Sequence, residues 1–283
     1  MNLTGIIVKG IGGFYYVKSP DGNICECRAK GLFRKEKIKP MIGDYVTVEN
    51  GSLAEISERK NMLIRPPVAN IDNLVIVSAA ASPSPDFFLI DKMTVTAKNK
   101  GIDVIICINK TDLASDSSIK LAYEGTGYPI ISVCAEENEG VDELMPYLKN
   151  KTTAFAGLSG VGKSSLLTLI TGHNMETGNV SEKIHRGRHT TRHVELLELE
   201  GGGFVLDTPG FSLFEVENIK AEDLWEYFPE FSGGECRFKG CSHINEPDCA
   251  IKQKLLQGKI AQSRYESYKT LYNQLKQVKE WEK

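Results

Sequence analysis

The chain has 283 residues, of which 41% are hydrophobic and 25% are charged, and its formal net charge is −3. These values are typical of a soluble globular protein with two or three domains. They exclude a globally basic nucleic-acid binder, so any attraction to nucleic acid must come from local patches. No stretch approaches the roughly eighteen apolar residues of a membrane span, and no basic segment precedes a long apolar run at the start. We therefore expect a cytoplasmic protein that does not contact a membrane.

Residues 1–64 consist of short runs of alternating character separated by glycine-bearing turns, such as "GIIVKG", "GFYYVKS" and "DYVTVENG". Many short strands at close spacing predict a small β-barrel of the OB type. The following "RPPVAN", residues 65–70, contains two prolines, which disfavour both helices and strand pairing. We therefore expect an interruption of regular structure here, and we place the first domain boundary after residue 64.

From about residue 71 to 215, continuous apolar runs such as "NLVIVSAA" and "DVIICIN" alternate with helix-like stretches. This alternation predicts a doubly wound α/β domain, in which helices cover both faces of a parallel sheet. Beyond it come a polar, aromatic helix, a cluster of cysteines, and a terminal helix over 263–283 that we expect to be largely exposed. The expected domains are a barrel at 1–64, an α/β domain at 65–215 and a helical domain at 216–283.

The stretch "GLSGVGKSS", residues 157–165, follows an apolar run and precedes a helix-like one. It fits G-x-x-x-x-G-K-[ST], in which backbone N–H groups wrap a polyphosphate, a lysine reaches the β and γ oxygens, and a hydroxyl holds Mg²⁺. A chance match to so short a pattern does occur, but the strand before it and the helix after it favour a phosphate-binding loop. The predicted phosphate-binding residues are Gly157, Leu158, Ser159, Gly160, Val161, Gly162, Lys163, Ser164 and Ser165. Lys163 is also a catalytic candidate, and Ser164 is a predicted Mg²⁺ ligand.

A further apolar run, "GGFVL", ends in "DTPG", residues 207–210. An aspartate at a strand end can support the Mg²⁺ shell, and a glycine three residues later can offer its backbone N–H to a γ-phosphate. By itself the sequence fits a simple turn equally well. Its place downstream of the phosphate loop favours Asp207 and Gly210 as members of the same nucleotide site.

The sequence "NKTD", residues 109–112, follows another apolar run. The Asp112 carboxylate can accept hydrogen bonds from guanine N1–H and from the exocyclic amine, whereas adenine presents the wrong edge, so the pattern favours GTP over ATP. The alternative is a polar loop after a buried strand. At the next strand end, "IISVCAEENEG" occupies the place where GTPases have a serine-led loop that touches the base. The predicted base-binding residues are Asn109, Lys110, Thr111, Asp112 and Ser132.

The base-reading sequences precede the phosphate loop, which is the reverse of the order in ordinary GTPases. A parallel α/β domain tolerates this, because its ligand loops all lie at the carboxyl ends of strands and its termini are often close enough for circular permutation. We therefore expect one guanine-nucleotide site in a rearranged chain order.

Residues 173–196, between the phosphate loop and DTPG, are polar, glycine-bearing and aperiodic. They are either an idle surface loop or a switch segment ordered by γ-phosphate and Mg²⁺. Thr191 or Thr190 is the candidate Mg²⁺-sensing hydroxyl, and His189 is the catalytic candidate. Phe211 stands where many regulatory GTPases have the glutamine that orients water. We therefore expect slow intrinsic hydrolysis, with the missing group supplied by His189, the switch segment or a partner.

The seven cysteines are unevenly distributed. Cys107 and Cys134 lie in apolar strand-like segments, which is typical of small buried hydrophobic residues. A second group has the spacing C-x₄-C-x-H-x₅-C, and three thiolates with an imidazole suit a closed tetrahedral zinc site that stabilises a small segment. The predicted zinc ligands are Cys236, Cys241, His243 and Cys249.

With its barrel, "NKTD" ahead of "GLSGVGKSS", then "GRHTT", "DTPG" and the Cys-Cys-His-Cys cluster, the whole chain resembles the ribosome small subunit-dependent GTPase A (RsgA) family. The resemblance implies an OB-fold, a circularly permuted GTPase domain and a zinc domain. It also implies GTP hydrolysis to GDP and phosphate, stimulated by the 30S subunit and its rRNA during late maturation. The family's switch histidine falls on His189. We expect a monomer.

Two basic stretches are candidate RNA contacts. The run "RAKGLFRKEKIKP", residues 28–40, places six basic residues around one acidic residue in the predicted barrel. On an OB-fold such a run can contact phosphates, or it can be a simple solvated face. The second stretch lies in the predicted switch segment and comprises Lys183, Arg186, Arg188 and Arg192.

Overall fold

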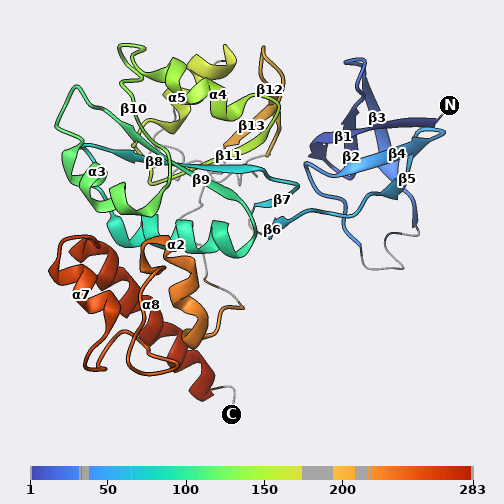
Figure 1. Cartoon of the computed structure of the whole chain (residues 1–283). Helices are drawn as coiled ribbons and strands as arrows, with labels where there is room; N and C mark the ends of the chain where they lie inside the picture. Colours follow the sequence, from blue (N-terminus) through green and yellow to red (C-terminus); the bar gives the residue numbers. More distant parts are fainter. Residues whose placement is uncertain are drawn as a thin grey trace, which may run out of the picture. The chain divides into compact units, whose positions relative to one another are not determined.

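The structure is a computed structural model that describes residues 2–31, 33, 38–64, 66–173, 194–207, 216 and 218–281. The chain runs from an N-terminal barrel through an α/β sheet to C-terminal helices (Figure 1). Within these residues, no helix is both long and apolar enough to cross a membrane.

The N-terminal part is a closed five-stranded barrel with strand order β1-β2-β3-β5-β4. Antiparallel pairing of β1 with β4 closes it. In the fourth strand Val46 and Val48 are buried whereas Tyr45 is exposed, which is the alternation expected of a strand with one face in a core. The strands are β1 (Asn2–Ile11), β2 (Phe14–Lys18), β3 (Ile24–Ala29), β4 (Tyr45–Glu49) and β5 (Ser52–Ile56). The predicted barrel is confirmed.

The first strand carries a β-bulge. Its register with β2 runs through Ile7 opposite Val17 and then Lys9 opposite Tyr16, so Val8 has no partner on that strand. Its pairing with β4 covers only Asn2–Ile6. A bulge bends a strand and redirects its backbone groups. The later part of β1 is therefore available for contacts outside the barrel ladder.

The "RPPVAN" stretch was expected to interrupt regular structure, and this expectation is wrong. β6 (Met62–Ile64) and β7 (Pro67–Ala69) form an antiparallel hairpin. Pro67 is tolerated because it is the first residue of its strand, where a missing N–H disturbs the ladder least.

The central sheet has six strands in the order β10-β9-β8-β11-β13-β12 (Figure 1). β10 pairs in parallel with β9, and β11 pairs in parallel with β13, whereas the edge strand β12 is antiparallel to β13. The sheet is therefore mixed rather than wholly parallel, as is common when an edge strand joins an α/β sheet. The strands are β8 (Asn73–Ala79), β9 (Asp103–Asn109), β10 (Ile130–Ser132), β11 (Thr152–Ala156), β12 (Leu197–Glu198) and β13 (Phe204–Asp207).

Helices alternate with these strands, as the sequence pattern predicts. Every residue of β8 and of β11 is buried, which fits strands covered on both faces. The helix that follows β8 begins at a side-chain cap, in which Asp86 accepts a hydrogen bond from the Leu89 N–H at 2.9 Å. The helices are α2 (Phe87–Asn99), α3 (Ser117–Tyr123), η1 (Glu124–Thr126), α4 (Val141–Leu148) and α5 (Lys163–Thr171).

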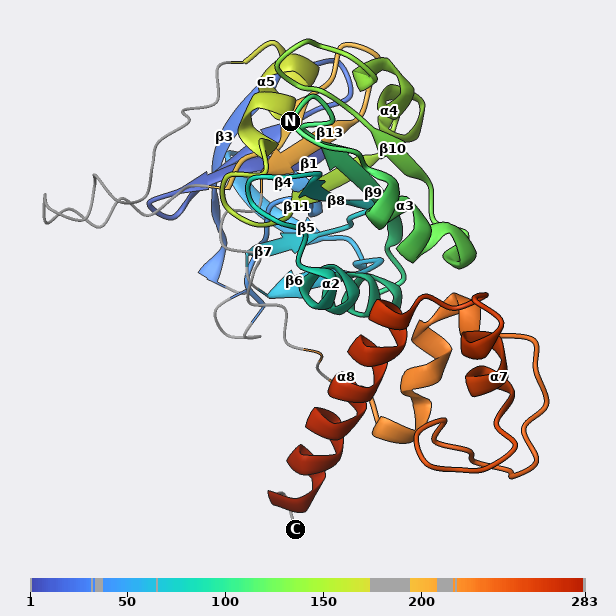
Figure 2. The same ribbon diagram turned by 90° about the vertical axis from the view of Figure 1, so that its left-hand side faces the viewer.

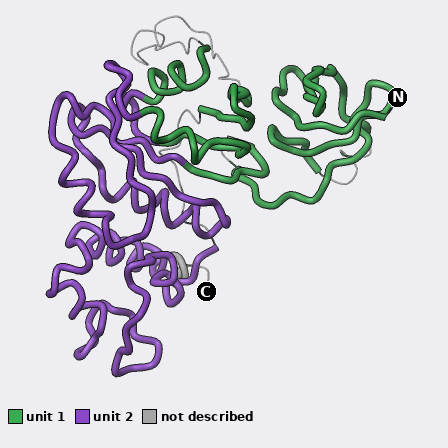
Figure 3. The backbone as a smooth tube through the Cα atoms, turned by 45° about the horizontal axis from the view of Figure 1, so that its top comes forward, with its two compact units in different colours: residues 1–74, 141–156, 163–211 green, residues 75–140, 157–162, 212–283 purple. Residues whose placement is uncertain are grey.

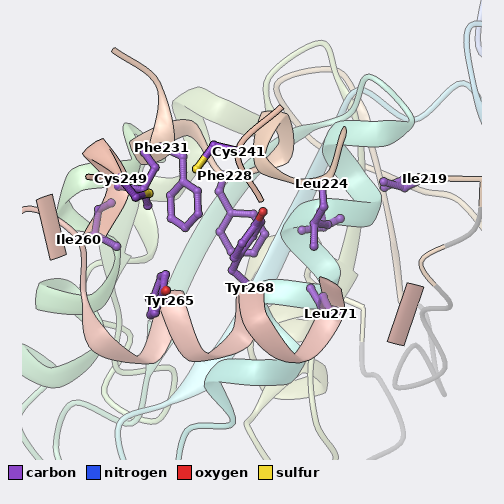
Figure 4. Close-up of a cluster of buried hydrophobic side chains, with 12 residues drawn as sticks. Ile219, Leu224, Phe228, Phe231, Cys241, Cys249, Ile260, Tyr265, Tyr268 and Leu271 are labelled. Carbon is purple, nitrogen blue, oxygen red and sulfur yellow. The ribbon is translucent and has the colours of Figure 1, made fainter. Parts of the chain in front are cut away.

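The C-terminal part comprises η4 (Ala221–Tyr227), η5 (Pro229–Phe231), α7 (Ala250–Leu256) and α8 (Gln262–Trp281). α8 begins beside α2 (Figures 1 and 2). Tyr265, Tyr268 and Leu271 of α8 are buried in one apolar cluster that also contains Leu224, Phe228 and Phe231 (Figure 4). The expectation of a largely exposed terminal helix is therefore wrong for the first half of α8, because its aromatic and apolar residues share one face.

A buried ionic network fixes α8. The guanidinium of Arg264 contacts both oxygens of Glu230, at 2.7 and 3.0 Å, and the Oδ1 atom of Asp91 in α2 at 2.6 Å. The Tyr123 hydroxyl donates to the same Asp91 oxygen at 2.6 Å. The Arg264, Asp91 and Glu230 side chains are each at most 3% exposed. The network therefore joins α2 and α3 to the C-terminal helices.

By its internal contacts the chain divides into two compact units (Figure 3). Unit 1 comprises residues 1–74, 141–156 and 163–211, and unit 2 comprises residues 75–140, 157–162 and 212–283. The barrel thus belongs with the helix that follows the phosphate loop. The cysteine cluster belongs with NKTD.

Candidate guanine-nucleotide site and metal centre

The phosphate loop has the local structure that its motif requires. β11 ends at Ala156 and α5 begins at Lys163, so residues 157–162 form the turn between them. Lys163 and Ser164 are half-buried in the first turn of α5, while Ser159 and Gly160 are exposed. The strand before and the helix after the loop agree with the sequence prediction.

Two positions of this loop require glycine because neighbouring atoms leave no room for a Cβ atom. A Cβ atom on Gly157 would lie 2.1 Å from the carbonyl oxygen of Val77, and one on Gly162 would lie 2.2 Å from Nδ2 of Asn109. Their φ angles, 148° and 91°, are also in the region that favours glycine. Both positions therefore exclude larger residues, and Gly162 does so because the loop touches NKTD.

Asp207 is the last residue of β13 and stands opposite Phe155 of β11 in the parallel register. Phe155 is two residues before the phosphate loop. Because parallel strands end at the same edge of a sheet, this register places the aspartate at the edge where β11 runs into that loop.

Asn109 connects three loops. Its Nδ2 donates to the carbonyl oxygen of Val161 in the phosphate loop at 2.9 Å, and its Oδ1 accepts from the Ala135 N–H at 3.0 Å. Its backbone oxygen accepts from the Ala80 N–H at 2.8 Å. Asn109 is only 2% exposed. One buried amide thus holds the phosphate loop and the base-reading loops together, and NKTD is not an ordinary surface turn.

The rest of NKTD is held by the loop after β10. The Thr111 hydroxyl donates to the Val133 carbonyl at 3.1 Å, and the Cys134 thiol donates to Oδ1 of Asp112 at 3.2 Å. Burial raises the pKa of that thiol, so it remains a donor at neutral pH. Asp112 is exposed, so it can also accept from a bound base. On the other side, the Lys110 ammonium donates to the Ser82 carbonyl.

Ser132 makes its side-chain hydrogen bond outside NKTD. Its hydroxyl donates to Asp116, the residue before α3. The residues that do contact NKTD are the next three along the chain, Val133, Cys134 and Ala135. The sequence pattern makes Ser132, Val133 and Cys134 a loose match to the base-supporting loop, selects Ser132 as the base contact, and assigns no role to Ala135. Val133, Cys134 and Ala135 follow the end of β10 directly, and this position is the feature of the sequence that could have identified them.

Several predicted residues lie outside the described residues. These are His189, Thr190, Thr191, Gly210 and Phe211, together with the basic stretch from Lys183 to Arg192. Of the basic run in the barrel, Arg28 lies over the Phe14 ring at 4.3 Å, and Lys30 pairs with Glu49 at 3.0 Å.

The four predicted metal ligands come together. The ligand atoms of Cys236, Cys241, His243 and Cys249 all lie within 4.8 Å of one another. The Sγ atoms of Cys236 and Cys249 are 3.9 Å apart, and His243 Nδ1 is 3.3 Å from the latter. Thiolates bound at about 2.3 Å to a tetrahedral zinc would be about 3.8 Å apart, so the donor set and its spacing fit such a metal.

The surroundings of the cluster set the protonation of its ligands and hold the loop that carries them. Burial raises the pKa of the Cys241 thiol to about 12 and lowers the pKa of His243, so the imidazole is neutral and a metal would have to displace thiol protons. The Tyr265 hydroxyl donates to the His243 carbonyl at 2.8 Å, and the Tyr268 hydroxyl donates to the Ser242 carbonyl at 2.8 Å. α8 thereby anchors the ligand loop (Figure 4).

Comparison with known proteins agrees with this geometry. Residues 56–217 match the RsgA GTPase family, and residues 4–55 match the RsgA N-terminal domain. The chain is 45% identical to a protein of Agathobacter rectalis over 97% of this chain and 98% of that protein, and 41% identical to one of Bacillus subtilis over 97% and 98%. Both relatives are named small ribosomal subunit biogenesis GTPase RsgA.

Two solved structures resemble the whole chain. YjeQ from Thermotoga maritima has a TM-score of 0.84 and 34% identity, covering 97% of this chain and 99% of that one. YloQ, described as a circularly permuted GTPase, has a TM-score of 0.81 and 38% identity over 98% and 96%. Base-reading loops ahead of the phosphate loop, on one α/β sheet, define this class, the circularly permuted GTPases. Within it, the chain belongs to the RsgA GTPase family.

Proposed function

We propose that this GTPase is a late-stage maturation factor of the 30S ribosomal subunit, which binds the subunit with GTP and leaves after hydrolysis. The names of its full-length relatives support the ribosomal role. The observation that most supports nucleotide binding is the buried Asn109 amide, which hydrogen-bonds both to the phosphate loop and to the loop after β10.

Within the site, residues 157–165 bind the phosphates, with Lys163 placed to stabilise charge on the transferred group. Asp112 reads guanine, and Cys134 and Ala135 hold the loop that contains it. Ser132 remains a predicted member of this loop. Thr111 and Lys110 complete NKTD.

We assign Mg²⁺ to Ser164, Thr191 and Asp207, with Gly210 at the γ-phosphate and His189 aiming water. We assign one structural zinc to the Cys-Cys-His-Cys cluster, because its donors fit a closed tetrahedral site. Zinc there supplies folding free energy, because it replaces a larger apolar core in a small segment.

The proposed domains are the barrel at 1–64, the GTPase domain at 65–215 and the zinc domain at 216–283. Arg28 and Phe14 give the barrel a cation stacked on a ring, which suits contact with rRNA. We further propose a cytoplasmic monomer.

The test is GTP hydrolysis by the full chain with and without purified 30S subunits. We expect slow hydrolysis alone and a clear acceleration by 30S, but not by 50S subunits, while Lys163→Ala stays inactive in every mixture. Equal rates with and without 30S would contradict the ribosomal role and favour a signalling GTPase that acts on another protein.

A further inference from the structure

Residues 195–198 contact both the barrel and the GTPase sheet. The Leu196 N–H donates to the Val8 carbonyl of β1 at 2.8 Å, and Glu195 forms an antiparallel bridge with Lys9. The next two residues are β12, which pairs with β13. The barrel, this short segment and β13 all belong to unit 1.

The β1 bulge provides the acceptor for this contact. Val8 has no partner on β2, and the pairing of β1 with β4 stops at Ile6. The Val8 carbonyl is instead used by Leu196. Val8 and Leu196 are both buried, so the contact excludes water around its hydrogen bond. A bulge bends its strand and interrupts the ladder, and here it turns the Val8 carbonyl toward Leu196, the residue just before β12.

Charge complementarity reinforces the contact at both ends. Lys9 lies 2.7 Å from Glu195, and Lys18 of β2 pairs with Glu198. Two barrel lysines therefore face two glutamates that are three residues apart on the segment. The Lys9 and Glu195 side chains are 32% and 39% exposed, so the pair is accessible to salt and to other charged molecules.

The segment is linked to Asp207 through the pairing of β12 with β13. Leu197 stands opposite Val205 and Glu198 opposite Phe204 in the β12–β13 ladder. β13 ends three residues after Phe204, at Asp207. A shift of residues 195–198 would therefore be passed through two short strands to the aspartate assigned to Mg²⁺.

We propose that the barrel is a positioning element of GTP hydrolysis: Lys9, Lys18 and the Val8 carbonyl hold residues 195–198 and so set the position of Asp207. The inference rests on the Mg²⁺ role assigned to Asp207 above. Lys9 and Lys18 are positioning residues, since they act through Glu195 and Glu198 and are not among the residues assigned to the nucleotide or to Mg²⁺. Disturbing them should slow hydrolysis and raise the Mg²⁺ requirement without weakening nucleotide binding.

The experiment uses the full chain without ribosomes. The variant Lys9→Glu/Lys18→Glu turns two attractions into repulsions. We expect its kcat to fall about three- to tenfold, its Mg²⁺ concentration for half-maximal rate to rise, and its GDP affinity to stay within about twofold. Adding Glu195→Lys/Glu198→Lys restores the charge pairs, and kcat should return to within about twofold of the parent.

The matched control is Lys269→Glu on α8, which breaks a similarly exposed pair with Glu266, 37% and 51% exposed, far from residues 195–198 in the sequence. It should leave kcat and the Mg²⁺ dependence unchanged. The inference is overturned if Lys9→Glu/Lys18→Glu keeps the parental kcat, if GDP affinity falls as much as kcat, or if the charge swap fails to restore the rate. A parent chain as inactive as Lys163→Ala even with 30S subunits would instead refute the proposed function itself.

Discussion

The barrel and the C-terminal helices are attached to the α/β elements by different kinds of contact. Arg264 joins α8 to α2 through carboxylates that are almost fully buried. The barrel holds residues 195–198 through one buried backbone hydrogen bond and two partly exposed lysine–glutamate pairs. Breaking a buried pair costs about 3–5 kcal/mol, whereas an exposed pair contributes about 0–1 kcal/mol and weakens in salt. We infer that the C-terminal helices form a permanent extension of α2, while the barrel contact can respond to its surroundings.

Loss of the proposed zinc should have the largest effect, because two of its ligands, Cys241 and Cys249, lie in the core of the C-terminal helices. In Cys236→Ser/Cys241→Ser, we expect zinc to fall from about one equivalent to almost none, and α8 to lose hydrogen-exchange protection. Elemental analysis and exchange mass spectrometry measure both. Cys25→Ser, in the barrel, is the control and should keep its zinc. Full metal content in the double variant would refute the ligand assignment.

Removal of the Arg264 side chain tests the buried network directly. Arg264→Ala leaves Asp91 and Glu230 buried without their cation, so the free energy of unfolding should fall by about 3–5 kcal/mol. Urea unfolding of the zinc-loaded chain measures this, with Lys269→Ala on the same helix as the control. A loss below about 1 kcal/mol would mean that α8 is held by its apolar face alone.

Asp112→Asn should change nucleotide affinity more than stability, because its carboxylate is exposed. The new amide cannot accept both guanine donors, so GTP should bind on the order of 100-fold more weakly. Xanthosine triphosphate, whose C2 carbonyl accepts from the amide, should bind better than GTP. Competition with a fluorescent nucleotide measures both ligands, and an unchanged GTP affinity would show that Asp112 does not read the base.

Cys134 offers a smaller change at the same loop. Cys134→Ala removes the thiol donor to Asp112 and should weaken GTP binding by about two- to fivefold, the value of one weak hydrogen bond. Cys134→Ser keeps a donor and should bind GTP at least as tightly as Cys134→Ala. Equal affinities for all three proteins would show that the contact does not orient the carboxylate.

The smallest effect on stability is expected at the barrel contact. Lys9→Ala should lower the free energy of unfolding by less than about 1 kcal/mol, and the loss should shrink at high salt. Urea unfolding at two salt concentrations checks this. A loss as large as that of Arg264→Ala would remove the distinction between the two attachments.

The sequence predicts best where the chemistry is local. The phosphate loop, NKTD and the cysteine cluster are each contiguous or nearly so, and the backbone or metal geometry they need allows few residue types. The barrel and the α/β sheet are predictable because the alternation of apolar and polar residues is also a local pattern. Even the permutation can be read from motif order, since the strand ends share one edge of the sheet whatever their order in the chain.

Features that depend on distant segments are not predictable in this way. Arg264, Asp91 and Glu230 come from three separate helices, and none stands out in its own segment. The Cys134 thiol looks like a core residue until Asp112 lies beside it. The effect of Pro67 on its strand likewise depends on its place in the ladder, which the sequence of that segment does not reveal.

The sequence separation within the Arg264 network constrains how the chain assembles during synthesis. Asp91 and Arg264 are 173 residues apart. A growing chain therefore displays the Asp91 carboxylate long before its cation leaves the ribosome, and the loop that must then close is long. Until that moment α2 cannot bury this face without an uncompensated charge. Unit 2 is thus completed last. A polypeptide released before residue 264 would carry an acidic α2 surface that the finished molecule covers.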